Sequence, residues 1–365
     1  MSIGIKSPGK YVQGKGALND LGKNVKKLGS KFLIVCSENN VKRIGGIMEE
    51  SLKSAEKECV FYRFNGECSK AEIESIMNAQ KENSCDVIIG AGGGKAIDAA
   101  KAAAENLGGL TLIVIPTIAS NDAPTSGVAV IYNDEGVVIK ALITRRNPDL
   151  VLVDTDIIAK SPKRLLSAGI GDALATWFEA RACKKSGAKN MARGTCSATA
   201  YMMARLCYDM LKENTEQALI DIDKNEATEA LENIVEANIY LSGIGWESGG
   251  LAVAHAVNDG LAHIKETHNM YHGEKVAFGT LTQLVIEGED EQELKEVMHL
   301  MHTANLPMTF SELGIEDTSE ENLRKAAEAA CVPTQSSKNL RADITADEVL
   351  KAMIRADELG RAYKA

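Results

Sequence analysis

Short apolar runs alternate with longer amphipathic stretches over the first part of the chain. The runs are rich in β-branched and aromatic side chains and are typical of buried strands; they cover residues 31–36, 58–63, 86–90 and 111–115. Segments with helical spacing lie between them, at about 17–28, 40–55, 70–83 and 94–107. Strands with few polar residues that alternate with helices indicate a parallel sheet covered on both faces.

The pattern changes after Pro162. Further short strands are predicted before it, at 127–132, 136–141 and 150–153. Beyond it, helical spacing continues without intervening strands, over 163–185, 190–213, 226–243 and 249–264. Ser161 and Pro162 supply a helix cap and a first-turn residue. We therefore predict an α/β domain over residues 1–161 and an all-helical domain over residues 162–365.

Composition places the chain among ordinary globular proteins. Its 365 residues are 45% hydrophobic and 25% charged, which excludes a disordered, collagen-like or small disulfide-rich protein. A chain of this length buries enough surface to fold without a metal, so any metal site needs a functional reason. Eight cysteines without a CxxC pair are typical of reduced thiols, and we expect a cytoplasmic protein.

Charge and hydropathy limit the possible partners. The net charge is −10, whereas binding a nucleic-acid backbone requires a clustered positive surface. The first residues contain no apolar core of signal-peptide length. The most apolar run, Leu110–Ile118, is short and interrupted by Pro116, so it cannot span a bilayer. We expect neither a nucleic acid nor a membrane as a partner.

A glycine-rich turn follows the third predicted strand. Residues 88–98 read Ile-Ile-Gly-Ala-Gly-Gly-Gly-Lys-Ala-Ile-Asp, so three consecutive glycines precede a helix. Glycines allow close approach of a ligand, and a helix start offers free amides and a positive dipole end, which suit a pyrophosphate. The alternative is a tight turn that needs glycine only for its geometry. Ala96 after Lys95 argues against a Walker loop.

A polar loop at residues 116–126 follows the next strand and contains Thr117, Ser120, Asp122 and Ser126. It belongs at the carboxyl edge of the sheet, where ligands of open α/β sheets bind. A polar turn capped by its own side chains is the alternative interpretation.

Four of the six histidines lie between residues 255 and 272. His255 is surrounded by apolar residues and needs a polar partner. A hydrogen-bonded core histidine and a metal ligand are the two interpretations. In the second case an acidic residue should complete the site, and Asp172 follows Gly169 and Gly171 at a glycine-marked helix start. Spacing alone does not select Asp172 from 51 acidic residues.

Together these motifs resemble the iron-containing alcohol dehydrogenases, and within that family the glycerol dehydrogenases. The matching stretches occur in the family's order, at residues 92–98, 116–124, 169–181, 247–255 and 272–279. The resemblance implies a Rossmann-like parallel-sheet domain followed by an all-α domain, which is the dehydroquinate synthase-like fold.

The same resemblance assigns residues to the site. Asp172, His255 and His272 match zinc ligands, Asp122 matches a carboxylate that touches glycerol, and His255 also belongs to the substrate site. These four residues form the implied catalytic set. The implied NAD contacts are Ser37, Gly93, Gly94, Lys95, Asp98, Thr117, Ser120, Ser126, Val128 and Tyr132.

Three positions depart from the family pattern. Thr176 stands where iron-binding relatives carry another histidine ligand, so we expect zinc. Asn258 replaces a frequent second histidine, which is not a ligand in the glycerol enzymes. Glu38 follows Ser37 where many members place the aspartate that holds the adenosine ribose. A negative charge there would repel a 2′-phosphate.

The implied activity is reversible oxidation of glycerol to dihydroxyacetone, with hydride transfer from C2 to NAD. Other small vicinal diols should also react, and a homo-oligomer, often an octamer, is usual in the family. One alternative is a glycerol-1-phosphate dehydrogenase, for which only Lys265 and Lys275 offer positive charge near the histidines. Others are a dehydroquinate-synthase-like lyase or cyclase and a nucleotide-binding regulator without metal.

Overall fold

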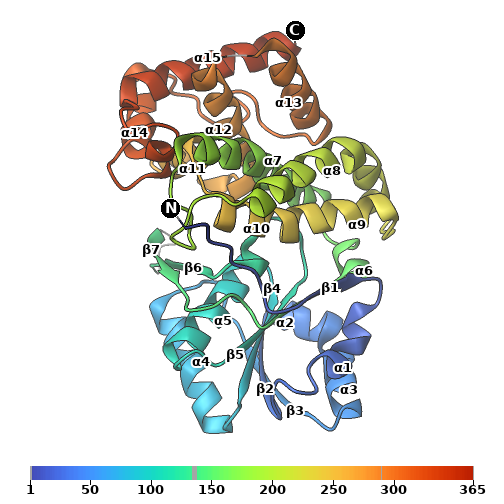
Figure 1. Cartoon of the computed structure of the whole chain (residues 1–365). Helices are drawn as coiled ribbons and strands as arrows, with labels where there is room; N and C mark the ends of the chain where they lie inside the picture. Colours follow the sequence, from blue (N-terminus) through green and yellow to red (C-terminus); the bar gives the residue numbers. More distant parts are fainter. Residues whose placement is uncertain (1, 134–137, 289, 365) are drawn as a thin grey trace.

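The computed structural model describes residues 2–133, 138–288 and 290–364. It consists of a sheet half and a helical half that follow one another along the chain (Figure 1). The sheet half contains all the strands of the described residues, and the helical half begins with a long helix at Lys163. The predicted order, a parallel-sheet domain followed by a helical one, is confirmed.

Six parallel strands form the main sheet. Their order across the sheet is β1-β8-β5-β4-β2-β3. The strands are β1 (Tyr11–Gly14), β2 (Lys31–Cys36), β3 (Glu58–Arg63), β4 (Val87–Gly92), β5 (Thr111–Pro116) and β8 (Leu150–Asp154). All five neighbouring pairs are parallel. The chain runs from β2 to β3 at the edge of the sheet and then returns to β4 on the other side of β2. The direction of winding therefore reverses between β2 and β4. In open α/β sheets, ligands generally bind at the carboxyl ends of the strands at such a switch point.

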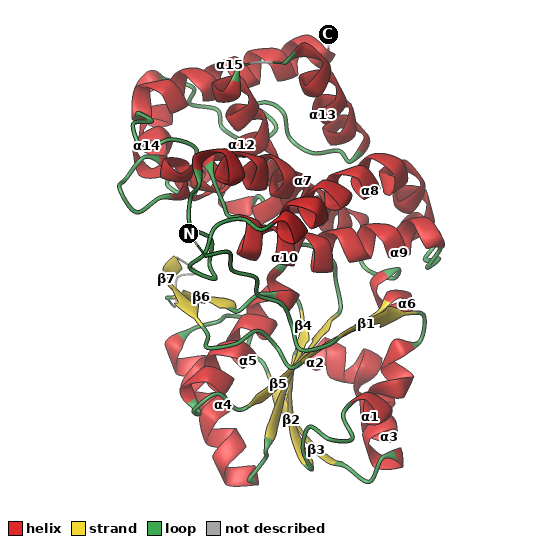
Figure 2. Ribbon diagram, in the orientation of Figure 1, coloured by secondary structure: helices red, strands yellow, loops and turns green. Residues whose placement is uncertain are grey.

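Helices cover both faces of this sheet (Figure 2). The α-helices of the sheet half are α1 (Leu21–Asn24), α2 (Glu38–Asn40), α3 (Gly46–Ser54), α4 (Lys70–Asn83), α5 (Gly94–Asn106) and α6 (Thr155–Ile158). The 3-10 helices η1 (Ala17–Asp20) and η3 (Ala123–Thr125) and the π-helix η2 (Val41–Gly45) also belong to this half.

Alternate strand residues enter two different cores because successive side chains point to opposite faces. Phe32 and Ile34 pack with Met48 and Leu52 of α3. Leu33 and Val35 pack on the other face, in a cluster that continues through α5 into the helical half. The two halves therefore share one apolar core on that side of the sheet.

The helical half is built from nine α-helices within the described residues. They are α7 (Lys163–Ser186), α8 (Ala198–Asp223), α9 (Glu229–Glu236), α10 (Ser242–Gly249), α11 (Val253–Leu261), α12 (His272–Glu287), α13 (Glu291–Thr303), α14 (Glu320–Ala330) and α15 (Ala346–Lys364). Shorter turns are η4 (Ala237–Leu241), η5 (Lys265–Asn269) and η6 (Ser336–Asn339). No helix among the described residues has the length and apolarity needed to cross a bilayer.

Several local predictions need correction. Strands β6 (Val128–Tyr132) and β7 (Val138–Ile143) confirm the strands predicted at 127–132 and, for its described residues, 136–141, and they form an antiparallel pair separate from the main sheet. Residues 136–137 of the predicted strand 136–141 lie outside the described residues. Strand β1 was missed, and the helix predicted over 190–213 begins at Ala198, where Ser197 caps it. Gly169 and Gly171 lie inside α7 and mark no helix start.

The cysteines are buried or half-buried free thiols, as the sequence predicts. Burial raises the pKa of Cys36 to about 11 and that of Cys68 to about 12. The reactive thiolate is therefore scarce at neutral pH.

Glycines allow three helices to approach closely. A Cβ on Gly273 of α12 would lie 1.8 Å from the carbonyl oxygen of Ala168 in α7. A Cβ on Gly279 would lie 2.2 Å from the carbonyl oxygen of Ala254 in α11. Because Gly273 follows His272 and Ala254 precedes His255, these contacts bring the two histidines toward α7.

We expect Gly273→Ala to destabilise the protein by about 2 kcal/mol or more, because the methyl group has no space between α12 and α7. Chemical denaturation would measure the change. Gly46→Ala is the matched control: Gly46 is an exposed residue of α3 with open space at the Cβ position. Its free energy of unfolding should change by no more than about 0.5 kcal/mol. Equal stability of the two variants would contradict the close-approach argument.

Candidate metal and cofactor site

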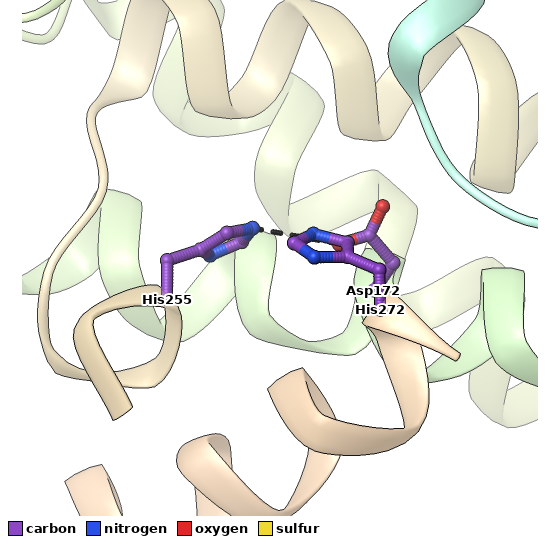
Figure 3. A group of neighbouring side chains, drawn as sticks. All are labelled: Asp172, His255 and His272. Carbon is purple, nitrogen blue, oxygen red and sulfur yellow. Dashed lines mark ion pairs between the residues drawn. The ribbon is translucent and has the colours of Figure 1, made fainter. Parts of the chain in front are cut away.

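Three side chains of metal-ligand type converge in the helical half. Asp172 comes from α7, His255 from α11, and His272 is the first residue of α12 (Figure 3). The Nε2 atoms of His255 and His272 lie 3.4 Å and 3.2 Å from Oδ1 of Asp172. Among the described residues this is the one group of three such side chains whose ligand atoms all lie within 4.8 Å of one another. The structure thus brings together the three predicted ligands.

Glu179 orients the imidazole of His255. Its Oε2 lies 2.6 Å from Nδ1 of His255, and its Oε1 accepts hydrogen bonds from the backbone N–H groups of His255 (3.0 Å) and Ala252 (2.8 Å). The Glu179 side chain is completely buried. A carboxylate at Nδ1 retains the proton on that nitrogen, so Nε2, which faces Asp172, is the nitrogen that would coordinate a metal ion.

The buried Oδ1 of Asp172 makes no hydrogen bond with the described residues. It faces the Nε2 atoms of both histidines, and a buried carboxylate oxygen requires positive charge beside it, which a metal ion or a protonated imidazole supplies. Two imidazoles and one carboxylate form a common set of protein ligands for catalytic zinc. The His272 side chain is 42% exposed, which leaves a route from solvent to this point. The residues fit a divalent metal.

The electrostatics agree with that fit. Burial would raise the pKa of Asp172, but the positive charge that His272 and His255 can carry outweighs burial and lowers it. Burial would likewise lower the pKa of His255, but Glu179 and Asp172 raise it well above its usual value. Two buried carboxylates therefore create a negative potential that favours any cation at this position.

Asp122, the predicted substrate carboxylate, lies beside this group. Its backbone N–H donates to Oδ2 of Asp172 at 3.3 Å. Its own Oδ2 accepts a 2.7 Å hydrogen bond from the Ser242 hydroxyl, which lies 3.0 Å from the hydroxyl of Thr176. Burial and the nearby Asp172 raise the pKa of Asp122 well above its usual range. The polar loop after β5 thus reaches the ligand group of the helical half.

Several predicted cofactor residues meet at the switch point of the sheet. Ser37 caps α2 at the end of β2, and Gly93 precedes α5 at the end of β4. Gly93 has no side chain to accept the first amides of α5, which leaves them free for an anion. The hydroxyl of Thr117, which follows β5, lies 3.5 Å from the side-chain amide nitrogen of Asn40 in α2. The ends of three adjacent strands thus supply these residues.

Other predicted cofactor residues already have protein partners. Lys95 pairs with Glu67 at 2.6 Å and lies over the Tyr132 ring. Asp98 accepts a hydrogen bond from the backbone N–H of Val130 and pairs with Lys101. Lys101 is also within hydrogen-bond reach of two further predicted contacts, the Ser126 hydroxyl and the Val128 carbonyl. Ser120 is half-buried at the same edge.

Glu38 faces positive charge. It pairs with Lys42 at 3.4 Å and with Arg63 at 2.5 Å. The adenosine-ribose contact expected at Ser37 or Glu38 stays a prediction.

Glu179 and Lys101 were missed by sequence reasoning. Glu179 lies two helical turns after Asp172 on the same face of α7, and Lys101 lies one turn after Asp98. Those spacings were visible in the sequence, but the partners on α11 and in the polar loop were not.

Comparisons with known proteins agree with this geometry. The family model described as iron-containing alcohol dehydrogenase matches residues 8–155. The glycerol dehydrogenase of Escherichia coli is 46% identical and the match covers 98% of both chains. The glycolaldehyde reductase of Halobacterium salinarum is 42% identical over 99% of both chains. The crystal structure of glycerol dehydrogenase from Schizosaccharomyces pombe superposes with a TM-score of 0.95 at 34% identity, over 100% of this chain and 92% of that one.

We expect Glu179→Gln to weaken zinc binding by about 10–100-fold, because the imidazole of His255 loses its charged partner. Competition with a chromogenic chelator would measure the affinity. Glu72→Gln is the matched control, since Glu72 is a buried carboxylate of the sheet half that accepts a backbone N–H from Asn65. Equal zinc affinity in Glu179→Gln and the unmodified protein would contradict the role of Glu179.

Proposed function

The chain belongs to the iron-containing alcohol dehydrogenase family, and we propose that it is an NAD-dependent enzyme that oxidises glycerol reversibly to dihydroxyacetone. In the forward direction the hydride of C2 and one hydroxyl proton leave glycerol, and NAD is reduced to NADH. The observation that carries this proposal is the convergence of Asp172, His255 and His272 beside Asp122.

Asp172, His255 and His272 are the residues that would hold the metal. A zinc ion held by them would supply positive charge that lowers the pKa of a nearby alcohol hydroxyl. Glu179 fixes the tautomer and orientation of His255. We propose zinc because Thr176 offers a hydroxyl bonded to Ser242, where iron-binding relatives are expected to place a third imidazole.

Asp122 is proposed to accept a hydrogen bond from a glycerol hydroxyl. Its carboxyl group is buried and fixed by Ser242, so it selects a substrate that presents a donor at that point. A buried acceptor left without a donor is costly, which disfavours simple alcohols that lack the adjacent hydroxyl.

NAD is proposed to bind at the carboxyl edge of the main sheet. Support comes from the uncapped start of α5 after Gly93 and from the convergence of β2, β4 and β5 at that edge. The nicotinamide end would then extend along the polar loop toward Asp122. The predicted contacts at Ser37, Gly94 and the polar loop belong to this proposal.

The substrate range is proposed to include other small vicinal diols. The relative from Halobacterium salinarum is named a glycolaldehyde reductase. Because reduction of glycolaldehyde gives ethylene glycol, ethylene glycol is one of the diols proposed as substrates. Glycerol 1-phosphate is the nearest rival substrate, and a lyase or cyclase reaction is the rival chemistry. The family resemblance further leads us to propose a homo-oligomer, an octamer, that works in the cytoplasm.

We expect the purified protein to form NADH with glycerol and propane-1,2-diol and to act poorly on glycerol 1-phosphate. Absorbance of NADH would follow the reaction, and its accumulation would exclude a lyase or cyclase. Removal of metal with a chelator should abolish this activity while NAD still binds, and zinc should restore it. Full activity in protein shown by elemental analysis to be free of metal would refute the metal's role.

We expect Asp122→Asn to lower kcat/KM for glycerol by about 10–100-fold, because an NH2 donor replaces one of the two carboxyl oxygens beside the substrate and Ser242. Steady-state kinetics would measure this change. NAD affinity and zinc content serve as internal controls and should stay as they are in the unmodified protein. A normal kcat/KM for glycerol would remove Asp122 from the substrate site.

A further inference from the structure

The segment Ser126–Val128 contains two of the proposed NAD contacts, and a buried lysine forms hydrogen bonds with it on one side. Lys101 of α5 is only 1% exposed. Its Nζ donates to the carbonyl oxygens of Ala123 (2.5 Å) and Val128 (2.8 Å) and lies 3.3 Å from the Ser126 hydroxyl. Asp98 supplies the opposite charge. Lys101 therefore fixes this segment to the sheet half.

A buried glutamate of the helical half bonds the same segment from the other side. Glu247 of α10 is completely buried, and its Oε1 accepts the backbone N–H of Gly127 at 3.0 Å. Asn147 donates to Oε2 of Glu247 and also to the carbonyl oxygen of Thr125, at 3.0 Å. The mechanism derived above does not use this carboxylate.

The opposite charge for Glu247 comes from the start of the chain. Nζ of Lys6 lies 3.2 Å from Oε1 of Glu247. Residues 2–6 run along the helical half (Figure 1). The backbone N–H of Lys6 donates to the Ser248 hydroxyl, which in turn donates to the carbonyl oxygen of Lys6. The carbonyl oxygen of Ser2 accepts the N–H of Thr195. A Cβ on Gly127 would lie 2.9 Å from this Nζ, so the three groups are in close contact.

Helix α10 also forms a hydrogen bond with Asp122. Its first residue, Ser242, donates to the carboxylate of Asp122, and Glu247 follows five residues later. One short helix therefore bonds both the proposed substrate carboxylate and the proposed cofactor segment.

We propose that Glu247, neutralised by Lys6, is a positioning residue that holds the Ser126–Val128 segment against the helical half and so sets the place of NAD relative to the metal centre. This inference rests on the proposed function, because it takes Ser126 and Val128 as NAD contacts. Without its negative charge the carboxyl group binds the N–H of Gly127 more weakly and no longer retains Lys6. Without Lys6 a buried carboxylate is left with hydrogen bonds but no cation.

The test measures NAD affinity by calorimetry on the full-length, zinc-loaded protein. We expect Glu247→Gln to weaken NAD binding about tenfold, the effect of losing one charged hydrogen bond. Lys6→Met should weaken it in the same direction. The double variant should bind NAD no more weakly than Glu247→Gln, because the two residues act as one pair. In kinetics the KM for NAD should rise more than kcat falls.

Asp357→Asn is the matched control. Asp357 is a buried carboxylate of α15 that accepts the N–H of Phe310 and pairs with Arg361, remote from the cofactor segment. It should lose stability on substitution but keep the NAD affinity of the unmodified protein. Equal weakening of NAD binding by Asp357→Asn would show a general effect of lost stability and overturn the proposal.

Unchanged NAD affinity in Glu247→Gln and Lys6→Met would also overturn it, as would simple additivity in the double variant. If Glu247→Gln does not fold, Lys6→Met alone decides, since Lys6 is partly exposed on the N-terminal segment. Failure of the unmodified protein to bind NAD would instead contradict the proposed function.

Discussion

Two carboxylates buried on one helix determine the chemistry of this molecule. Asp172 and Glu179 lie two turns apart on α7, at 1% and 0% side-chain exposure, and His255 lies between them. A buried carboxylate without a positive partner is costly, so the fold must supply a cation there. Glu179 is satisfied by the imidazole N–H and backbone amides, whereas Oδ1 of Asp172 has no hydrogen bond and faces the Nε2 atoms of two histidines. The same geometry that makes this cluster unfavourable without a cation makes it a good metal site.

The helix packing around this cluster explains how the ligands meet. Backbone contacts at Gly273 and Gly279 let α12 approach α7 and α11 at distances that any side chain would prevent. Ligands placed on helices held by backbone contacts have little freedom to shift. The placement of Asp172, His255 and His272 is therefore set by closely packed helices, while the exposed side of His272 leaves access from solvent.

The contact between the halves is polar as well as apolar. One apolar core runs from the sheet into the helical half, and α10 adds hydrogen bonds from Ser242 and Glu247 to the loop and strand that follow β5. Asp122 bonds Asp172 through its backbone as well. Loops usually move more than the elements they connect. Here the loop that carries the proposed substrate and cofactor contacts is tied to the half that carries the metal ligands.

The sequence by itself determined the strands with their alternating cores, the helical second half and the glycine turn, because strand and helix periodicities and turn glycines are local properties. It also offered His255 and, without selecting it from 51 acidic residues, Asp172, whereas the assignment of Asp172, His255 and His272 as one ligand set came from a family resemblance. Only the tertiary structure decided that β6 and β7 leave the main sheet, that Glu179 orients His255, and that Lys6 reaches Glu247 across 241 residues. Such contacts join residues far apart in the chain, and a single sequence carries no signal for a partner that only packing brings near.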